Sequence, residues 1–443
     1  MTKQDLKERI SRAVDDLGPE IMEMGQFIYD HPELGYKEKA ATDYMADILS
    51  RAGFEVTRDI ALTGVRAQWP ETFSGPTLAV LGELDAVPCR EHPHAHPGTG
   101  AVHACGHHIQ AAVMAGMALV LKQTGALEAL GGNLVFMAVP AEEFVEMEFR
   151  EGLKEDQKIS YFGGKQEMVA RGQFDGIDMA LMMHALDMGE GKKALIAPTG
   201  NGFVGKKIIF KGKEAHAGSA PEEGINALNA AMLAMNNIHA QRDTFADPDR
   251  VRVHPIITRG GDAVNVVPAE VHMETYVRAR SRESLLDANA KVDRALKAGA
   301  AALGAGIEIR DMPGYLPLLN TPELDELLAA NLDGLGEGDA VIRGGDFTGS
   351  FDFGDISHLM PCLHPFFGGV GGSLHSKEFR MTDPETAYLL PVKALAHTAV
   401  DLLWEKAQAA QAVLDDFNPV MTKAEYLEWL SACEGIQVLE MEK

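Results

Sequence analysis

Apolar residues recur at helical spacing over the first fifty positions of the chain. Within residues 4–17 they lie three or four positions apart, which is typical of an amphipathic helix. A second helix is expected over 19–29 and a third over 37–52. We place a break after the second helix at His31-Pro32, because the residue before a proline disfavours the helical conformation. These fifty residues are therefore expected to form a helical layer.

Strands that alternate with helices predict an α/β fold for the next part of the chain. We expect buried strands over 77–88, 133–143 and 179–186, because each is almost continuously apolar, and a helix over 109–123. This pattern indicates a mixed, mostly parallel sheet with helices on both faces. In such sheets, ligands bind beyond the carboxyl ends of the strands. These ends carry four candidate side chains: Asp85, Glu142, Glu143 and His184.

The middle of the chain changes to an alternation of apolar and polar residues. The expected order is strand, helix, two strands, helix and strand, at 202–213, 225–241, 250–260, 271–281, 282–302 and 306–311. This order is typical of a small α+β sandwich. We therefore predict an inserted domain at 199–315 and a discontinuous first domain at 1–198 and 316–443. The segment from about residue 405 onward is expected to be helical and carries no recognisable chemistry.

Composition narrows the classes of partner. The chain has 443 residues, too many for one compact core, and its formal net charge is −25. Such an acidic chain repels nucleic acids and anionic membranes. The first residues lack the apolar stretch of a secretory signal, and the longest apolar run, near 111–121, is about half of a membrane span. We expect a cytoplasmic protein without a membrane or nucleic-acid partner.

The segment HACGHH, residues 103–108, concentrates metal-ligating side chains just before a helix. The four cysteines of the chain are far apart and form no CxxC pair, which disfavours a disulfide framework or a redox pair. A thiolate at Cys105 and an imidazole at His107 suit zinc or a similar divalent ion. The alternative is a buried thiol beside surface histidines.

Two further segments carry residues suited to hydrolytic chemistry. Glu142 and Glu143 follow a buried strand, and one could bind a metal while the other takes a proton from water. They could equally form part of a solvated acidic loop. His184 ends an apolar strand, where an isolated histidine is usually structural. His375 lies in the glycine-rich loop GGVGGSLHSKEF, a setting that favours function.

Candidate residues in the inserted domain are more ambiguous. His216 follows a strand and precedes a helix, so it could be a simple turn residue. Arg278 lies on a strand and could hold a carboxylate through a bidentate pair, although such a residue is more often on the surface. Asn265 lies in the same domain.

Eight motifs in a fixed order remove much of this ambiguity. They are DAVP, HACGHH, PAEE, MMHA, KEAHAGSAPEEGINA, GGDAVNVVPAEV, GSFDFGDISH and SLHS. Together, over about residues 20–400, they resemble the M20 metallopeptidase family. The resemblance is to its amidohydrolase branch, which includes aminoacylases, hippurate hydrolases, auxin-conjugate hydrolases and aminobenzoyl-glutamate hydrolases. The segment GSFDFGDISHLMP is most similar to aminobenzoyl-glutamate hydrolases and Xaa-Arg dipeptidases.

The resemblance implies a hydrolase with two divalent metal ions, of which manganese and zinc are the expected candidates. The implied ligands are Cys105, His107, Glu143, His184 and His375. Glu142 matches the general base, and Asp85 is placed with it among the catalytic residues. His216 matches a histidine that crosses a dimer interface to polarise the scissile carbonyl, and Asn265 and Arg278 match positions that hold the substrate. The inserted domain is then a lid and dimerisation domain of a homodimer.

Three departures from the family pattern border the expected metal site. His108 stands where an aspartate is usual, and Glu83 stands in place of another aspartate. The segment with His92, His94 and His96 is longer and richer in histidine than expected, and we interpret it as a solvated loop. The predicted function is hydrolysis of the amide bond of N-acyl amino acids or dipeptides. The alternatives are a strict dipeptidase, an N-carbamoyl amino acid hydrolase, and a non-catalytic scaffold that retained a metal.

Overall fold

The computed structural model describes residues 1–70 and 73–441. They form two compact units. The first unit contains residues 1–198, 319–346 and 355–420, and the second contains 199–318, 347–354 and 421–443. Most of the chain beyond 421 thus lies with the second unit, whereas the sequence analysis placed it in the first domain. No helix in the described part of the chain is long and apolar enough to cross a membrane.

A six-stranded, mixed α/β sheet forms the centre of the first unit. Its strands, in sheet order, are β1 (Glu55–Ile60), β2 (Gly64–Gln68), β6 (Asn133–Val139), β3 (Thr77–Glu83), β7 (Met179–Leu181) and β16 (Cys362–Leu363). The last four are mutually parallel, and β1 and β2 are antiparallel. The mostly parallel sheet expected from the apolar runs is therefore confirmed.

Smaller sheets complete the first unit. One has the order β15 (Val341–Gly345), β9 (Ala194–Pro198), β17 (Phe366–Phe367) and β8 (His184–Ala185). Two hairpin-like pairs join β4 (Val87–Pro88) to β5 (Ala101–Val102) and β18 (Val370–Gly371) to β19 (Arg380–Met381). The expected strand 179–186 is thus two short strands in different sheets. His184 lies in the second of these strands rather than at the end of one long strand.

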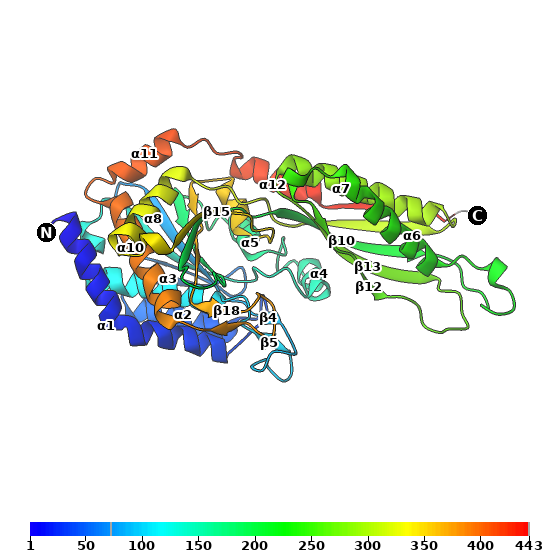
Figure 1. Ribbon diagram of the computed structural model, residues 1–443, viewed down its shortest axis with the longest axis horizontal. Coiled ribbons are helices and arrows are strands. Elements are labelled where there is room, and N and C mark those ends of the chain that lie inside the picture. The colour runs from blue at the N-terminus through cyan, green and yellow to red at the C-terminus, as the bar shows by residue number, and fades with distance from the viewer. Residues whose placement is uncertain (71–72, 442–443) are drawn as a thin grey trace. The chain divides into compact units, whose positions relative to one another are not determined.

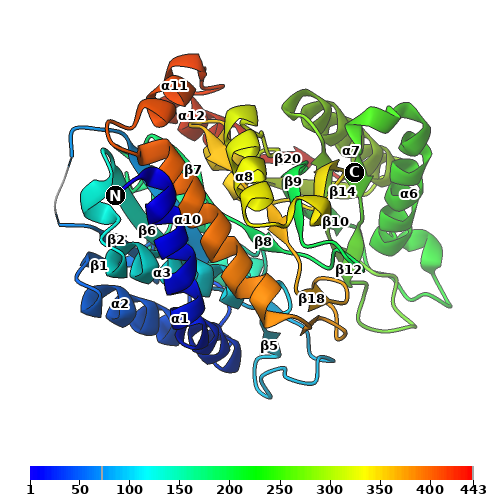
Figure 2. The same ribbon diagram turned by 60° about the vertical axis from the view of Figure 1, so that its left-hand side comes forward.

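The helices of the first unit are α1 (Lys3–Asp30), α2 (Lys39–Arg51), α3 (His107–Gln123), α4 (Met147–Glu155), α5 (Gly164–Ala170), α8 (Pro322–Gly334), α10 (Leu390–Leu403) and α11 (Gln408–Asp416). Helices α2, α3 and α8 contact strands of the large sheet. The short helix α9 (Phe353–Ser357) runs across the division between the units. Helices α1, α3 and α10 lie side by side, as Figure 2 shows. Almost every residue of α3 is buried, because it packs against helices on one side and the sheet on the other.

The first helix differs from the expectation of two helices divided near residue 18. It continues through Pro19 to Asp30. A proline inside a helix removes one backbone hydrogen bond. The cost is offset because the apolar stripe continues on both sides of Pro19, and Val14 and Ile21 are both fully buried in the same core. Close packing of α1 on α3 requires Gly116, where an added Cβ would lie 3.0 Å from Ile21.

The second unit is an antiparallel sheet packed against helices. Its strands are β10 (Gly202–Lys211), β11 (Arg252–Val253), β12 (Ile256–Arg259), β13 (Glu270–Ala279), β14 (Gly306–Pro313) and β20 (Gly435–Leu439). Its helices are α6 (Ala227–Ala240), α7 (Arg282–Ala301) and α12 (Lys423–Cys433), and Figure 1 shows α6 and α7 on one face of the sheet. The end of the chain was expected to be helical, but β20 pairs with β14.

Candidate metal centre and active site

Two parallel strands bring the acidic candidate residues to one edge of the sheet. Glu83 at the end of β3 is paired in register with Val139 at the end of β6. Both strands end earlier than the apolar runs suggested, so Asp85 and the pair Glu142–Glu143 lie in the loops that follow. These loops leave the same edge of the sheet, which is where parallel α/β sheets bind ligands.

The five expected metal ligands come together in two groups that share one thiol. Cys105, His107 and His184 form the first group, and Cys105, Glu143 and His375 form the second. Within each group the candidate ligand atoms lie within 4.8 Å of one another. Except for His375, which is half exposed, these side chains are buried or nearly so.

The distances between these atoms fit ions of zinc or manganese size. Cys105 Sγ lies 3.5 Å from His184 Nε2 and 3.2 Å from His375 Nε2. His375 Nε2 lies 2.8 Å from Glu143 Oε1. Two ligands of one ion, each at about 2.0–2.3 Å, lie roughly 2.8–3.8 Å apart at angles of about 90–110°. Each of the two groups could therefore hold a divalent cation, and both groups include the Cys105 sulfur.

Asp85 orients two members of the cluster. His107 Nδ1 lies 2.9 Å from the Asp85 carbonyl oxygen and 3.1 Å from its Oδ1. The backbone N–H of Glu143 donates to Asp85 Oδ2 at 2.8 Å. His107 Nε2 is thereby directed away from Asp85 and lies 3.1 Å from Glu83 Oε2, but the geometry of this pair is not that of a hydrogen bond. Outer carboxylates of this kind fix the tautomer and direction of metal-binding histidines.

Charge in the cluster favours the ligating forms of its thiol and its carboxylate. Burial and the Glu143 charge raise the pKa of Cys105, but nearby His107, His375 and His184 outweigh them and lower it to about 6. Burial raises the pKa of Glu143, yet His375 lowers it to about 2. The Glu143 charge raises the pKa of His375 to about 12. A thiolate and a carboxylate are the forms that bind divalent cations.

The structure adds Glu83 and Lys165 to the residues around the site. Glu83 Oε2 lies 3.1 Å from His107 Nε2, and Glu83 Oε1 accepts a hydrogen bond from Lys165 Nζ at 2.6 Å. Glu83, His107 and Glu142 form a third group of possible ligands. Glu83 was noted as a departure from the family pattern, but Lys165 gave no sequence signal because it lies 82 positions away.

Buried charged groups also hold the loop that carries the two glutamates. Glu38 Oε1 accepts the Ala141 N–H at 2.7 Å, and Arg150 Nη2 donates to the Glu143 carbonyl at 2.5 Å. Arg150 is only 1% exposed. Gly164 lets α5 approach this loop, since an added Cβ would lie 1.6 Å from the Pro140 carbonyl oxygen. Neither Glu38 nor Arg150 was identified from the sequence.

The histidine-rich segment is ordered by its own imidazoles. His92 is buried, with Nε2 2.9 Å from the Phe379 carbonyl oxygen, and its Nδ1 accepts the His94 N–H. His94 and His96 are exposed, as expected for a solvated loop. His108 is buried beside Tyr29, with ring centroids 5.0 Å apart.

The remaining candidates all belong to the second unit. His216 is exposed, and its Nδ1 accepts the N–H groups of Gly218 and Ser219 at 3.2 and 3.1 Å. The Asn265 carbonyl accepts the Ala217 N–H at 3.0 Å, which brings Asn265 near His216. Arg278 donates to Ser350 Oγ at 2.7 Å. The structure therefore groups His216 with Asn265, and the seven other candidates lie together in the first unit.

Comparison with known proteins identifies relatives over most of the chain. Residues 200–303 match the M20 peptidase dimerisation domain. The mouse Xaa-Arg dipeptidase is 29% identical, with 91% of this chain and 90% of that protein covered. An N-acyl-L-amino acid amidohydrolase of Geobacillus stearothermophilus is 27% identical, over 72% of this chain and 83% of that protein.

Solved structures show the same fold. A Bacillus subtilis protein described as a dinuclear metal binding peptidase from the M20 family superposes with a TM-score of 0.66. It is 23% identical, and the match covers 88% of this chain and 99% of that one. The chain is therefore similar over most of its length to peptidases and amidohydrolases, its residues 200–303 match the M20 peptidase dimerisation domain, and these relatives support a hydrolase.

Proposed function

We propose that this protein hydrolyses the amide bond of N-acyl amino acids or dipeptides at a binuclear metal centre. The observation that carries the proposal is the position of Cys105 in two ligand groups, beside a second carboxylate at Glu142. One group consists of Cys105, His107 and His184, and the other of Cys105, Glu143 and His375. Two cations, when bound, would polarise the scissile carbonyl and lower the pKa of water toward neutrality.

The side chains around the ions have separable tasks. Glu142 takes the proton of the attacking water and later returns it to the leaving amine. Asp85 keeps His107 in one orientation through the contacts at 2.9 and 3.1 Å and holds the Glu143 backbone at 2.8 Å. Lys165 neutralises Glu83, which limits the negative charge that the buried cluster carries when no cation is present.

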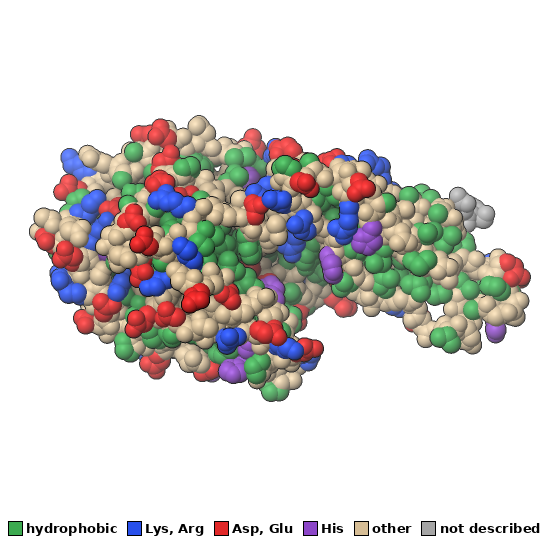
Figure 3. Space-filling model, in the orientation of Figure 1, with side chains coloured by type: hydrophobic (Ala, Val, Ile, Leu, Met, Phe, Trp, Pro, Cys, Tyr) green, Lys and Arg blue, Asp and Glu red, His purple; other side chains and the backbone are tan. Residues whose placement is uncertain are grey.

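Residues of the second unit supply recognition in this proposal. By the motif resemblance, His216 polarises the substrate carbonyl, and Asn265 and Arg278 hold the substrate. The same unit would form the interface of a homodimer. Exposed apolar residues at the β12 edge support this interface, since Ile256 is 51% and Ile257 38% exposed. Apolar side chains are visible on this part of the surface in Figure 3.

Metal analysis with a substrate panel tests the proposal. Wild-type protein is expected to carry about two ions per chain and to hydrolyse acyl amino acids or dipeptides. Cys105→Ala should lose both properties, and Cys89→Ala is the matched control because Cys89 is a half-buried thiol outside the ligand groups. Glu142→Gln should keep its metal and lose turnover by about 10²–10⁴-fold.

The outcomes discriminate between the alternatives. Activity on dipeptides alone would identify a strict dipeptidase, and activity on N-carbamoyl amino acids alone would identify an N-carbamoyl amino acid hydrolase. Metal-replete protein that hydrolyses nothing in the panel would contradict the proposal and favour a scaffold. Glu142→Gln with unchanged turnover would remove Glu142 from the role of general base.

A further inference from the structure

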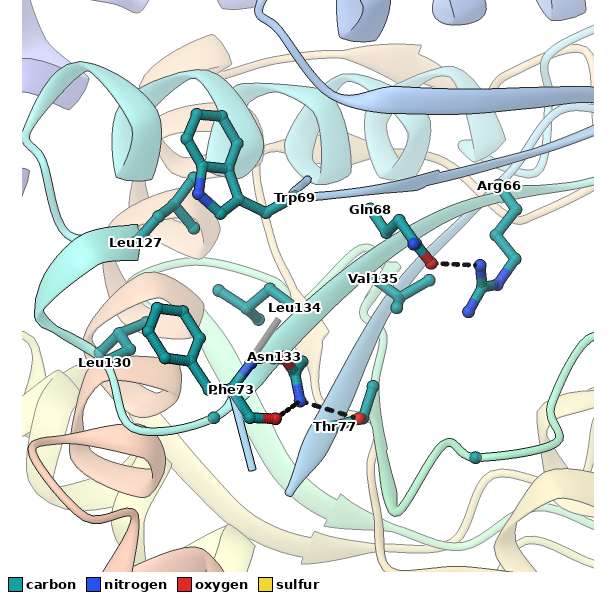
Figure 4. Close-up of a pocket in the computed structure, with 12 residues that line it drawn as sticks. Arg66, Gln68, Trp69, Phe73, Thr77, Leu127, Leu130, Asn133, Leu134 and Val135 are labelled. Carbon is teal, nitrogen blue, oxygen red and sulfur yellow. Dashed lines mark hydrogen bonds between the residues drawn. The ribbon is translucent and has the colours of Figure 1, made fainter. Parts of the chain in front are cut away.

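A small cavity lies at the opposite end of the central sheet from the candidate metal centre. Its volume is about 130 Å³, and Thr77 and Asn133, the first residues of β3 and β6, line it (Figure 4). The metal-site loops follow the last residues of the same strands. At about 3.3 Å per residue, the seven residues of β3 separate the two places by roughly 20 Å. The cavity is therefore not part of the proposed active site.

The cavity contains a cation, Arg66, with no acidic partner in the part of the chain that the structure describes. Arg66 is half-buried, and its Nη1 donates to Gln68 Oε1 at 2.7 Å. Among residues 1–70 and 73–441, no carboxylate forms an ion pair with Arg66, although the chain has 65 acidic residues. Burial lowers the pKa of this guanidinium, as expected when no anion compensates its charge. An anionic group would meet free N–H donors here.

The rest of the lining is mostly apolar. Figure 4 shows Arg66 and Gln68 toward one side, and Trp69, Phe73, Leu127 and Leu130 toward the other. The Trp69 indole N–H is buried and has no acceptor among the described residues. Buried donors without an acceptor are uncommon in folded proteins, so this wall can also serve an oxygen atom of a ligand.

Size and chemistry together define the class of ligand. A cavity of about 150 Å³ lined by apolar side chains is large enough for benzene. We propose that this cavity is a second binding site, which takes a small carboxylic acid whose carboxylate pairs with Arg66 and whose short apolar or aromatic body lies against Trp69 and the leucines. Benzoate has the required charge and a benzene-sized ring, and its carboxylate would lie at the partly exposed side chains of Arg66 and Gln68. The site is independent of the proposed hydrolytic function.

Trp69 makes the site directly measurable. Titration of the metal-loaded protein with benzoate is expected to change tryptophan fluorescence saturably, with a dissociation constant on the order of 1 mM for so small a ligand. Benzyl alcohol, a neutral molecule of similar shape, should bind at least about tenfold more weakly, because the charge-assisted hydrogen bond is lost. The change should persist after chelation of metal, which excludes binding at the metal centre.

Variants connect the signal to the cavity. Arg66→Met should weaken benzoate at least about tenfold. Arg58→Met is the matched control, because Arg58 lies on the neighbouring strand but pairs with Asp43 and Asp47. Trp69→Phe should lose the optical signal and still bind benzoate by calorimetry. Circular dichroism and unchanged hydrolytic activity, if the protein has any, establish that Arg66→Met is folded.

Three results would overturn the site. They are an absence of saturable benzoate binding in wild type, equal affinity for benzyl alcohol, and unchanged affinity in folded Arg66→Met. A signal that disappears on chelation would assign benzoate to the metal centre instead. Because binding is measured without turnover, failure of this proposal and failure of the proposed hydrolysis give different results.

Discussion

Glu38 provides a test of how the first unit tolerates buried charge behind the loop that carries Glu142 and Glu143. The side chain is fully buried, its Oε1 accepts the Ala141 N–H at 2.7 Å, and its Oε2 accepts the Thr63 hydroxyl at 2.5 Å. Burial and the nearby Asp85 charge raise its pKa from 4.5 to about 7. Glu38→Gln preserves the shape and both contacts, since its amide can accept from Ala141 and donate to the Thr63 oxygen.

The sign and size of the effect follow from linkage. The folded chain holds the Glu38 proton more tightly than the unfolded chain, so wild-type stability falls as pH rises from about 4.5 to about 7. At about 1.4 kcal/mol per pKa unit, the cost is on the order of 1 kcal/mol at pH 5.5 and 3 kcal/mol at pH 8.5. Glu38→Gln cannot ionise and escapes this cost. Its advantage over wild type should therefore grow by about 2 kcal/mol across this range.

Thermal unfolding of metal-free protein at pH 5.5 and 8.5 measures this difference. The lower limit stays above the pI of about 5.0, where low net charge promotes association. About 2 kcal/mol corresponds to roughly 3 °C in a unit of about 290 residues. Glu20→Gln, at an exposed position of α1, controls for the loss of one acidic residue. An identical difference between Glu38→Gln and wild type at both pH values would refute the reasoning.

Three other perturbations have defined expectations. Arg150→Met removes hydrogen bonds to two buried backbone carbonyls, so it should lower kcat about 10–100-fold and the free energy of unfolding by about 2–4 kcal/mol. Elemental analysis should show that the metal content is retained. Steady-state kinetics in which KM alone changes would contradict this prediction. Lys206→Met leaves Asp293 and Asp311 without their buried cation, so it should lower the free energy of unfolding of the second unit by about 3–5 kcal/mol in calorimetry. The control Lys211→Met removes an exposed ion pair and should lower it by less than about 1 kcal/mol. Metal at a hundredfold excess over its dissociation constant should stabilise the first unit by about 2.7 kcal/mol for each ion bound, and an unchanged melting curve after chelation would argue against metal binding to the folded chain.

The sequence determined the local features of this protein. Continuous apolar runs predicted the parallel strands β3 and β6, because strands buried on both faces lack a polar side. The apolar run over 109–123 placed Cys105 and His107 just before a helix, and the structure begins α3 two residues earlier, at His107. Element ends were less accurate: the apolar run at 133–143 outlasts β6, which ends at Val139, because residues of the following loop are also buried.

Only the tertiary structure decided which distant residues share an environment. The pairing of Glu83 with Lys165 joins positions 82 apart, and the support of Ala141 by Glu38 joins positions 103 apart. The addition of β20 to the sheet of the second unit, and the isolation of Arg66 in a cavity, depend on the same kind of contact. The spacing of apolar residues along the chain indicates which face of one segment is buried. It carries no information about which segment faces it, and the burial and charge of these groups are set by that partner.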